Sequence, residues 1–291
     1  MTYDLYIGDR SFSSWSLRGW LMLEAFGLPY RTHLVGLYSG SFAEDLAPLA
    51  PARTVPILRT PEGHLLTDSL AMAETLAERH PDAGLWPGDP AARALARSIV
   101  AEMHASFMPL RAACPMFLRH GWAGFAPSDA VRADLARVET LWELARARHG
   151  EGGPWLFGAY SLADVFYAPL ATRIATYDLP VGEVAARYVA SHLADPALRR
   201  WRAEGQIVDY DPMPYRMELP PRDWPGPTPP ASEPAPAAEA LNAACPFSGK
   251  PVSHALRVGG HVIGFCNAGC RDKVAVDPMA WPEVARLLTG D

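Results

Sequence analysis

The segment Thr54-Val55-Pro56 constrains the fold of this chain more than any other. Its proline follows a β-branched residue at the start of the apolar run Ile57-Leu58, where it removes one ladder donor and makes a cis peptide bond accessible. A cis bond there would leave the N–H and C=O of Val55 facing outward, free to pair with an extended peptide as an added strand. An ordinary edge-strand proline is the alternative.

A second anchoring element follows at Asp68-Ser69, immediately before a helical stretch at residues 70–76. The N–H groups of the first helical turn and the Ser69 hydroxyl suit a carboxylate, which the positive end of a helix attracts. One element would hold a peptide backbone and the other an anionic end, which predicts a small peptide-like ligand. An ordinary N-cap is the alternative explanation.

The segment upstream reads as a strand, a serine-rich turn and a helix. Residues 3–7 alternate like a strand with one polar side. Apolar residues recur at helical spacing over residues 17–26, and a glycine and a proline follow them. One serine suffices as the N-cap of such a helix. The turn holds more than that: Ser11, Ser13, Ser14 and Ser16.

With strand, serine turn, helix, Val-Pro, strand pair, Asp-Ser and helix in this order, the chain resembles the glutathione transferase family over roughly residues 1–210. The run Ser13-Ser14-Trp15-Ser16-Leu17-Arg18 is similar to the Ser-Ser-x-Ser-x-Arg signature of serine-type members such as the zeta class. The resemblance implies an α/β thioredoxin-like glutathione-binding domain over residues 1–80. It also implies an all-α helical transferase domain over residues 88–210, glutathione as co-substrate, and a homodimer.

Composition and charge fit an enzyme of small molecules. A chain of 291 residues suggests about two domains. The net charge is −6 and no basic block stands out, which argues against nucleic acid as a partner. The sequence shows neither a signal-peptide pattern at its start nor an apolar run long enough to span a bilayer. We therefore expect a cytoplasmic protein whose four cysteines stay reduced or bind metal.

Residues from about 89 to 205 read as helices with clear start signals. Asp89-Pro90 places a capping carboxylate before a proline at the first helical position, and that helix is expected to run through Leu110. A second helix is expected to start at Ser128. A third starts at Ser161, where Asp164 completes a capping-box-like pattern that we expect to serve folding rather than catalysis.

Residues 218–243 are rich in proline, interleaved with alanine, glycine, serine and glutamate. We expect a semi-extended linker of polyproline character, since so many prolines prevent helix formation. An extended strap on the enzyme surface is the alternative.

A compact segment at residues 244–288 follows and holds three of the four cysteines. Two alternating runs joined by Gly259-Gly260 predict a β-hairpin. Cys266 ends the second run, and Cys270 lies four residues later in the first turn of a helix, whose positive end favours thiolates. The hairpin brings Cys245 back toward them, so three sulfurs should converge. The fourth cysteine, Cys114, is expected to be a packed core residue.

The cysteine spacing, together with Asp277-Pro278 and Trp281, resembles the small TRASH/YHS-type metal-binding modules. The resemblance implies a treble-clef-like module that binds zinc or another thiophilic metal, which would also stabilise so small a core. We expect Cys245, Cys266 and Cys270 as ligands. The fourth ligand is left open among His254, His261, Asp277 and a water, with His261 nearest in sequence to the sulfur pair. A reduced apolar mini-domain is the alternative.

The chemistry that the first resemblance implies begins with the glutathione thiol. A thiol with a pKa near 8.5 is only about 3% thiolate at pH 7. A serine hydroxyl that donates a hydrogen bond to the sulfur, beside a helix N-terminus, stabilises the anion. Serine acts here as a donor and not as a base.

The resemblance also implies the roles of individual residues. It maps the catalytic position onto Ser13, with Ser14 as a possible second donor and Ser11 as a weaker candidate. The ligand would be held by the Val-Pro and Asp-Ser elements: Val55 and Pro56 at its cysteinyl part, Asp68 at its ammonium and Ser69 at its γ-glutamyl carboxylate. Arg53 or His33 could reach the glycyl carboxylate.

The substrate pocket is expected to be lined by aromatic and helical residues near the glutathione site: Phe12, Trp15, His104, Phe107, Met108 and Arg111. Zeta-like members isomerise maleylacetoacetate with a cysteine where this chain has Trp15, and with an arginine on a later helix whose matching position here is Thr176, one turn after Arg173. Both departures argue against isomerase activity. We therefore expect conjugation of glutathione to a small hydrophobic electrophile, as in detoxification. Cis–trans isomerisation and a non-enzymatic metal-handling or regulatory role are the alternatives.

Overall fold

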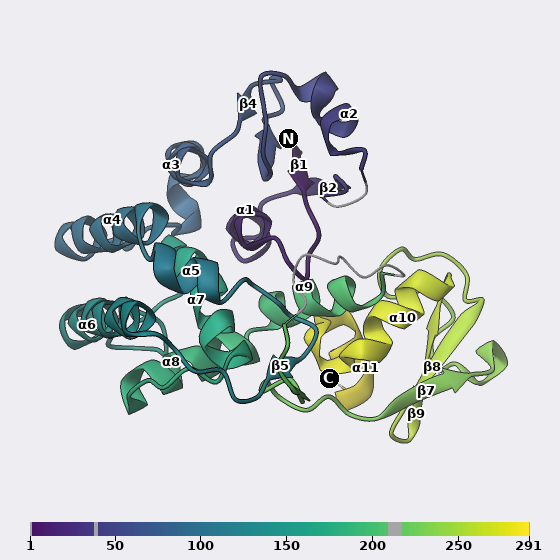
Figure 1. Cartoon of the computed structure of the whole chain (residues 1–291). Coiled ribbons are helices and arrows are strands. Elements are labelled where there is room, and N and C mark those ends of the chain that lie inside the picture. Colours follow the sequence, from purple (N-terminus) through teal and green to yellow (C-terminus); the bar gives the residue numbers. More distant parts are fainter. Residues whose placement is uncertain (1, 38–39, 209–216, 291) are drawn as a thin grey trace. The chain divides into compact units, whose positions relative to one another are not determined.

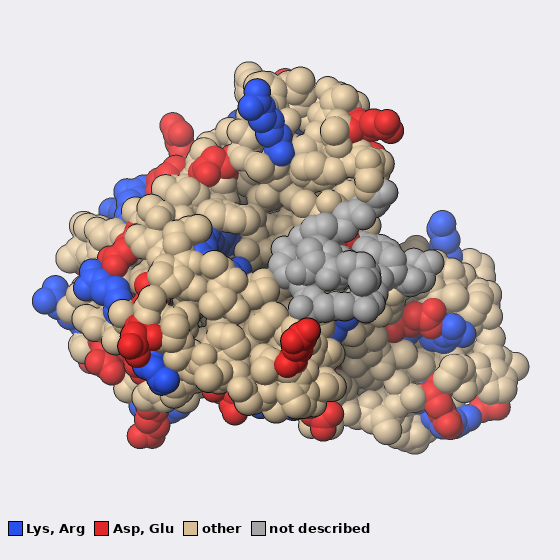
Figure 2. Space-filling view, in the orientation of Figure 1, with Lys and Arg blue, Asp and Glu red and all other residues tan. Residues whose placement is uncertain are grey.

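The computed structural model describes residues 2–37, 40–208 and 217–290 (Figure 1). The chain divides into two compact units. The first comprises Met1–Leu193 with Pro212–Pro225, and the second comprises Ala194–Asp211 with Gly226–Asp291. On the face that Figure 2 draws, acidic and basic side chains are interspersed rather than gathered by sign, as the sequence indicates.

The N-terminal part of the first unit is a four-stranded mixed sheet in the order β2-β1-β3-β4. Its central strand β1 (Tyr3–Ile7) pairs in parallel with β2 (Tyr30–Leu34) and antiparallel with β3 (Ile57–Arg59). The short strand β4 (Leu65–Leu66) pairs antiparallel with β3. Because β1 buries every second side chain, the alternation in the sequence is confirmed.

Helices complete this sheet in thioredoxin-like order. Helix α1 (Ser14–Glu24) joins β1 to β2, and α3 (Ser69–Arg79) follows β4. Between β2 and β3 lie α2 (Phe42–Leu46) and the 3₁₀ turn η1 (Ala47–Leu49). A second 3₁₀ turn, η2 (Pro81–Ala83), ends this part of the unit.

Close packing of α1 on the Val-Pro segment depends on a glycine. A Cβ atom built at Gly19 of α1 would lie 2.9 Å from both Cβ and Cγ of Pro56. Real Cβ atoms do not approach so closely, and the proline ring cannot swing away. Glycine at this position therefore lets α1 rest directly on Pro56.

The rest of the first unit is mainly helical, as expected. Its elements are α4 (Pro90–Ala105), α5 (Met108–Ala113), β5 (Gly121–Trp122), α6 (Asp129–His149), α7 (Leu162–Thr176), α8 (Glu183–Ala194) and β6 (Pro221–Arg222), which pairs with β5. All fifteen residues of α7 are buried. The predicted caps at Asp89, Ser128 and Ser161 are confirmed, each accepting a hydrogen bond from a backbone N–H of its helix.

The helix predicted to run from Pro90 through Leu110 is instead two helices. Phe107 has a φ of 64°, in the left-handed region that non-glycine residues rarely adopt. Helix α4 ends at Ala105 with Ser106 as its C-cap, and Phe107 is the N-cap position of α5, whose second residue is Pro109. Apolar periodicity continued across the break, which is why the sequence pattern did not reveal it.

Asp164 lies at the centre of the buried polar contacts around α7. Its carboxylate accepts hydrogen bonds from the backbone N–H of Leu156 and of Ser161 at 3.1 and 2.9 Å, and from the Tyr188 hydroxyl at 2.8 Å. The capping box with Ser161 is confirmed, which fits the expected structural role. Burial raises the pKa of Asp164 to about 6, against the hydrogen bonds that favour its ionised form.

The second unit contains helix α9 and a three-stranded antiparallel sheet in the order β7-β8-β9. The predicted hairpin is present as β8 (His254–Val258) and β9 (His261–Phe265), and the predicted helix as α10 (Ala268–Val276) with Asn267 as N-cap. The remaining elements are α9 (Pro196–Gln206), β7 (Ser232–Ala235), η4 (Ala237–Glu239), η5 (Pro278–Ala280) and α11 (Pro282–Thr289). Leu256, Ile263, Phe265 and Trp281 form its core together with Ala203 of α9.

Helix α9 and the proline-rich segment differ from what the sequence predicts. Helix α9, which the sequence places in the helical domain, groups with the C-terminal unit. There, Nε and Nη2 of Arg199 donate to the two carboxylate oxygens of Asp277 at 2.8 and 2.7 Å. The proline-rich segment is extended, but parts of it are paired strands: β6 with β5, and β7 with β8. A proline is tolerated in β7 because this strand lies at the edge of its sheet.

Within the described residues, no helix is both long and apolar enough to cross a membrane.

The substitution Asp164→Asn should lower the free energy of unfolding by about 3 kcal/mol, because an amide nitrogen would face N–H and O–H donors that the carboxylate now satisfies. Urea unfolding followed by tryptophan fluorescence at pH 7.5, where the carboxylate is ionised, measures this loss. Asp129→Asn, at the exposed first turn of α6, is the matched control and should cost less than about 0.5 kcal/mol. Equal, small losses in both variants would contradict the assigned role of Asp164.

Candidate active site and cysteine cluster

The serine turn before α1 uses Ser13 to build the helix start. The Ser13 side chain is buried and accepts a hydrogen bond from the Ser16 N–H at 3.3 Å. Its hydroxyl donates to the Ser16 Oγ at 2.7 Å, and that oxygen also accepts from the Gly8 N–H at 2.9 Å. Ser13, the residue that the resemblance maps onto the catalytic position, therefore has its hydroxyl hydrogen directed at Ser16.

Ser14 is placed differently. It is the first residue of α1, it is partly exposed, and its Oγ accepts a hydrogen bond from Nη2 of Arg173 at 3.3 Å. Among the residues that the structure describes, the Ser14 hydroxyl makes no other hydrogen bond. Its hydrogen remains available to an acceptor in the adjacent cavity.

The Val-Pro element has the expected backbone. The Val55–Pro56 peptide bond is cis. Over the described ranges of the chain, the Val55 N–H and C=O have no hydrogen-bond partner, whereas Ile57 already pairs with Tyr6 of β1. One unpaired donor and one unpaired acceptor beside the cavity can bind an extended peptide backbone.

Asp68 and Ser69 form the start of α3. Asp68 is the N-cap, and its Oδ1 accepts from the backbone N–H of Leu70 and of Ala71 at 2.8 and 3.1 Å. Its Oδ2 lies 3.3 Å from Nε2 of His104. The Ser69 Oγ is buried and has no hydrogen-bond partner in the described structure. Both predicted anchoring residues are therefore at the helix N-terminus, with one hydroxyl unsatisfied.

A cavity of about 700 Å³ adjoins Ser13, Ser14 and Val55. This volume suits a small ligand. Three arginines line it, and none of the described lining residues is an aspartate or a glutamate. The other lining residues are mostly apolar: Phe12, Trp15, Leu37, Phe42, Thr54, Met108, Ala112, Pro115 and Met116. The three arginines are Arg53, Arg111 and Arg173.

Arg173 of α7 is a cavity residue that the sequence pattern does not assign to the site. Thr176, the position expected to match the family's arginine, is fully buried and donates to the Phe117 carbonyl at 2.9 Å. Arg173, one turn earlier, reaches both the cavity and Ser14. The sequence signal for Arg173 is an arginine one turn before Thr176. Which of these side chains faces the cavity depends on the rotation of α7 about its axis.

Positive charge extends behind the cavity wall. The Arg18 guanidinium is buried, and it lies 4.6 Å from the centre of the Trp15 ring. Burial lowers the pKa of Arg18 well below its ordinary value, and the neighbouring charges of Arg111 and Arg173 lower it further. Burial likewise lowers the pKa of His104, against the attraction of Asp68. Basic side chains therefore dominate this part of the site, with Arg53, Arg111 and Arg173 on the cavity wall and Arg18 behind it.

Several predicted residues lie outside the cavity. His33 is bound to Asp4, 2.9 Å from Nε2 to Oδ1, and stacks on Tyr6, so the structure does not bring it to the site. Ser11, His104 and Phe107 are also absent from the described cavity lining. Cys114 is buried, and burial raises its pKa to about 12, which fits the expected core role.

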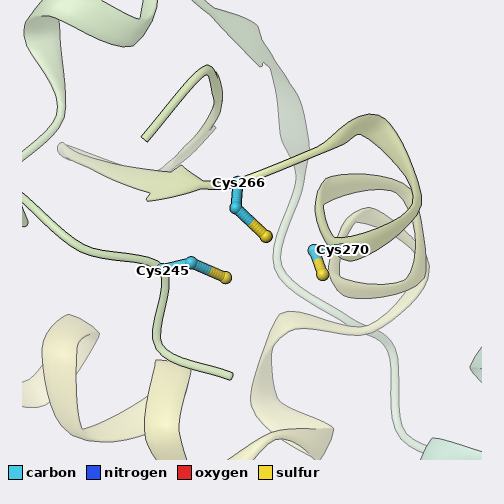
Figure 3. A group of neighbouring side chains, drawn as sticks. All are labelled: Cys245, Cys266 and Cys270. Atoms are coloured by element: carbon cyan, nitrogen blue, oxygen red, sulfur yellow. The ribbon is translucent and has the colours of Figure 1, made fainter. Parts of the chain in front are cut away.

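In the second unit, three cysteines converge as the sequence predicts. Cys245 comes from a loop, Cys266 directly follows β9, and Cys270 lies in the first turns of α10, with their side chains directed toward one another (Figure 3). The three sulfur atoms lie within 4.8 Å of one another. That spacing is suited to three ligands of one metal ion.

Burial, hydrogen bonds and neighbouring charge give the thiols of Cys245 and Cys270 different pKa values. Burial raises the pKa of Cys245, but hydrogen bonds from backbone N–H groups outweigh it and lower this pKa to about 6. Burial and the neighbouring Cys245 sulfur raise the pKa of Cys270 to about 11. Cys266 accepts from the Ser248 hydroxyl at 3.2 Å and from Nδ2 of Asn267 at 3.3 Å. The Cys245 thiol is therefore more acidic than the Cys270 thiol.

The structure does not bring His261 to the sulfurs. His261 is exposed at the start of β9, whereas Cys266 follows the far end of that strand. Asp277 is held by Arg199, and His254 lies next to Ser253, with Nδ1 2.9 Å from its Oγ. In the described part of the chain, no histidine or carboxylate joins the three sulfurs.

Comparison with known proteins places this geometry in context. Residues 12–79 match the family model for the glutathione S-transferase N-terminal domain. Over 177 residues the chain is 35% identical to the maleylacetoacetate isomerase of Pseudomonas aeruginosa, a match covering 57% of this chain and 78% of that protein. Over 168 residues it is 30% identical to a probable maleylacetoacetate isomerase of Caenorhabditis elegans, covering 56% of this chain and 77% of that protein.

A solved structure with a similar fold is the maleylacetoacetate isomerase from Anaeromyxobacter dehalogenans 2CP-1, with dicarboxyethyl glutathione and citrate bound in its active site. The TM-score is 0.51 at 25% sequence identity, and the match covers 74% of this chain and 97% of that one.

Proposed function

The chain belongs to the glutathione S-transferase family, and from that premise we propose that it is a glutathione-dependent cis–trans isomerase of a small dicarboxylic acid. That it is a glutathione-dependent enzyme follows from the family. The isomerase proposal rests on one observation: the cavity beside the serine turn has three arginines and, among its described lining, no carboxylate. Maleylacetoacetate, the substrate named for the relatives, carries two carboxylates.

Glutathione would bind across the elements already described. Its cysteinyl backbone would pair with the free N–H and C=O of Val55, with Pro56 fixing that segment on α1. Its γ-glutamyl end would meet the start of α3, where Asp68 takes the ammonium and the unpaired Ser69 hydroxyl takes the carboxylate. Arg53 on the cavity wall would reach the glycyl carboxylate.

The glutathione sulfur would then lie beside Ser14. The Ser14 oxygen accepts from Arg173, so its hydrogen can point to the sulfur and stabilise the thiolate. The N-terminus of α1 adds its positive end. Ser13 contributes by capping the same helix, which keeps Ser14 in place.

The thiolate would attack one carbon of the cis double bond, and the electron pair of that bond would move to the conjugated carbonyl as an enolate. The former double bond is then single and rotates. Return of the electron pair expels the thiolate and leaves the trans isomer, with no net change in atoms or charge. Arg173, beside the sulfur, would stabilise the negative charge that develops.

Conjugation to a neutral electrophile is the second candidate, because the same thiolate and the apolar part of the lining would serve it. The cationic lining favours an anionic acceptor, which is why we place isomerisation first. The departure at Trp15 argues against isomerisation, whereas Arg173, which lines the cavity and bonds Ser14, supports it by offering an arginine from the later helix. Homodimerisation and a cytoplasmic location remain predictions.

We propose in addition that the cysteine cluster binds one thiophilic metal ion, with zinc as the default occupant. Three sulfurs within 4.8 Å support this, since reduced cysteines in a core have no need to converge. Cys245, Cys266 and Cys270 would be the ligands, and water or an external ligand would complete the site. A TRASH/YHS-like, treble-clef-like architecture is part of the same proposal.

Ser14→Ala should reduce kcat/KM for glutathione-dependent isomerisation of maleylacetoacetate about 100-fold, as expected for loss of one donor to a developing anion. Ser13→Ala is the matched control: it should lower stability by about 1 kcal/mol through loss of the cap and retain most of kcat. Steady-state kinetics and thermal unfolding of both variants measure this. Full activity in Ser14→Ala, with activity lost in Ser13→Ala, would assign the donor to Ser13 instead.

Protein purified under reducing, chelator-free conditions should contain about one metal ion per chain by elemental analysis. Replacing Cys245 or Cys270 with serine should abolish the stoichiometric metal, whereas Cys114→Ser should retain it because Cys114 lies in the core of the other unit. Absence of metal from the unmodified protein, or equal metal in all variants, would refute the site.

A further inference from the structure

We propose that Arg111 is the second carboxylate-binding residue of the cavity, that Trp15 holds its guanidinium there, and that the pair selects dicarboxylates over singly charged substrates. This inference rests on the proposed function and assigns a specificity role within the same site. It uses residues of the first unit only.

Arg111 presents one unused edge of its guanidinium. Its Nη1 donates to the carbonyls of His104 and Ser106 at 3.3 and 3.2 Å, at the end of α4. Within the described structure, Nε and Nη2 make no hydrogen bond. The side chain is half-buried on the cavity wall, so this edge is the part of Arg111 that remains available to a ligand.

The Nε and Nη2 atoms, which form the unused edge of Arg111, bind carboxylates in two other arginines of this chain. Nε and Nη2 of Arg97 bind the two oxygens of Glu74 at 3.1 and 2.8 Å, and those of Arg137 bind Glu102 at 2.6 and 2.8 Å. Such forked pairs match the planar geometry of a carboxylate. Arg111 has the same donors without a carboxylate.

Trp15 fixes the direction of Arg111. The guanidinium carbon of Arg111 lies 4.7 Å from the centre of the Trp15 ring, and that of Arg18 lies 4.6 Å from it. A ring face attracts a cation most when water is excluded. A cysteine at this position, as in the zeta-class turn, would offer no such face. Trp15 thereby compensates in part for the absence of a carboxylate.

The backbone around Arg111 is held in an uncommon conformation. Phe107, four residues earlier, has a φ of 64°, and this bend separates α5 from α4. The carboxylate of Asp134 accepts from the Leu110 N–H at 3.0 Å and fixes the start of α5. Strained residues persist where the surroundings support them, commonly at ligand sites. We take this bend as part of the placement of Arg111, which lines the cavity from α5.

Two arginines on different helices suit a substrate with two carboxylates. Arg173 is bonded to Ser14, so it would hold the carboxylate nearer the sulfur, and Arg111 of α5 would hold the other. A substrate with one carboxylate would leave Arg111 partly desolvated without a counter-charge. The cost of that unpaired, desolvated charge lowers the affinity for the singly charged substrate. It adds to the difference already made by the attraction between Arg111 and the second carboxylate.

The test compares binding of S-(1,2-dicarboxyethyl)glutathione with binding of glutathione itself, by isothermal calorimetry on the full-length protein. The unmodified protein should prefer the dicarboxyethyl adduct. Arg111→Met should reduce that preference about 10- to 100-fold and leave the affinity for glutathione within about two-fold. Arg97→Met, which removes an exposed arginine of α4 outside the cavity, should change neither affinity.

Arg111→Lys covers the case in which Arg111→Met fails to fold, because the ammonium can still reach the end of α4. It should keep a native circular dichroism spectrum and lose most of the preference, since it lacks the fork. An unchanged preference in either folded variant, or an equal loss of affinity for both ligands, would overturn the role of Arg111. Failure of the unmodified protein to bind glutathione would instead overturn the proposed function.

Discussion

The buried guanidinium of Arg173 joins the parts of the first unit on which the site depends. From α7 it donates to the carbonyls of Cys114 and Pro169, at 2.8 and 3.2 Å, and to the hydroxyl of Ser14 at 3.3 Å. One side chain thus connects the loop after α5, the helix α7 itself and the start of α1. Its carbonyl bonds fix its position, and its bond to Ser14 orients the hydroxyl that we assign to the glutathione thiolate.

The charge distribution follows from the same arrangement. Burial is the main cause of the lowered pKa of Arg18. The nearby positive charges of Arg111 and Arg173 lower it further. The described cavity lining supplies no carboxylate to compensate. Elsewhere in the chain arginines are forked to carboxylates, as Arg97 is to Glu74. The absence of a carboxylate from the described cavity lining supports the proposal that this site binds anions, namely the glutathione thiolate and a carboxylate-bearing substrate.

Much of the fold could be predicted from the sequence because its signals are local. Helix starts at Asp89, Ser128 and Ser161 depend on a capping side chain within three residues, and all are present. The hairpin around Gly259-Gly260 and the convergence of three cysteines follow from strand direction and from one helical turn. The cis bond at Pro56 could also be anticipated, since proline after a β-branched residue at a strand start has few other uses.

The features that could not be predicted depend on contacts between distant segments. That Arg173 reaches the cavity depends on which face of α7 meets Ser14, a residue far away in sequence. The break at Phe107 is hidden because apolar periodicity continues through it. His261 is near the sulfur pair in sequence, yet it starts a strand whose far end precedes Cys266. Helix α9 resembles its helical neighbours, but its Arg199 binds Asp277 of the C-terminal unit.

Titration of the glutathione thiolate by its ultraviolet absorbance in the complex tests whether Ser14 and Arg173 stabilise the anion. We expect the sulfur of bound glutathione to have a pKa of roughly 6.5 instead of about 8.5, and we expect Ser14→Ala and Arg173→Met each to return it toward the free value. A bound sulfur that titrates like free glutathione, or that keeps its lowered pKa in both variants, would contradict the assignment of these two residues to the thiolate.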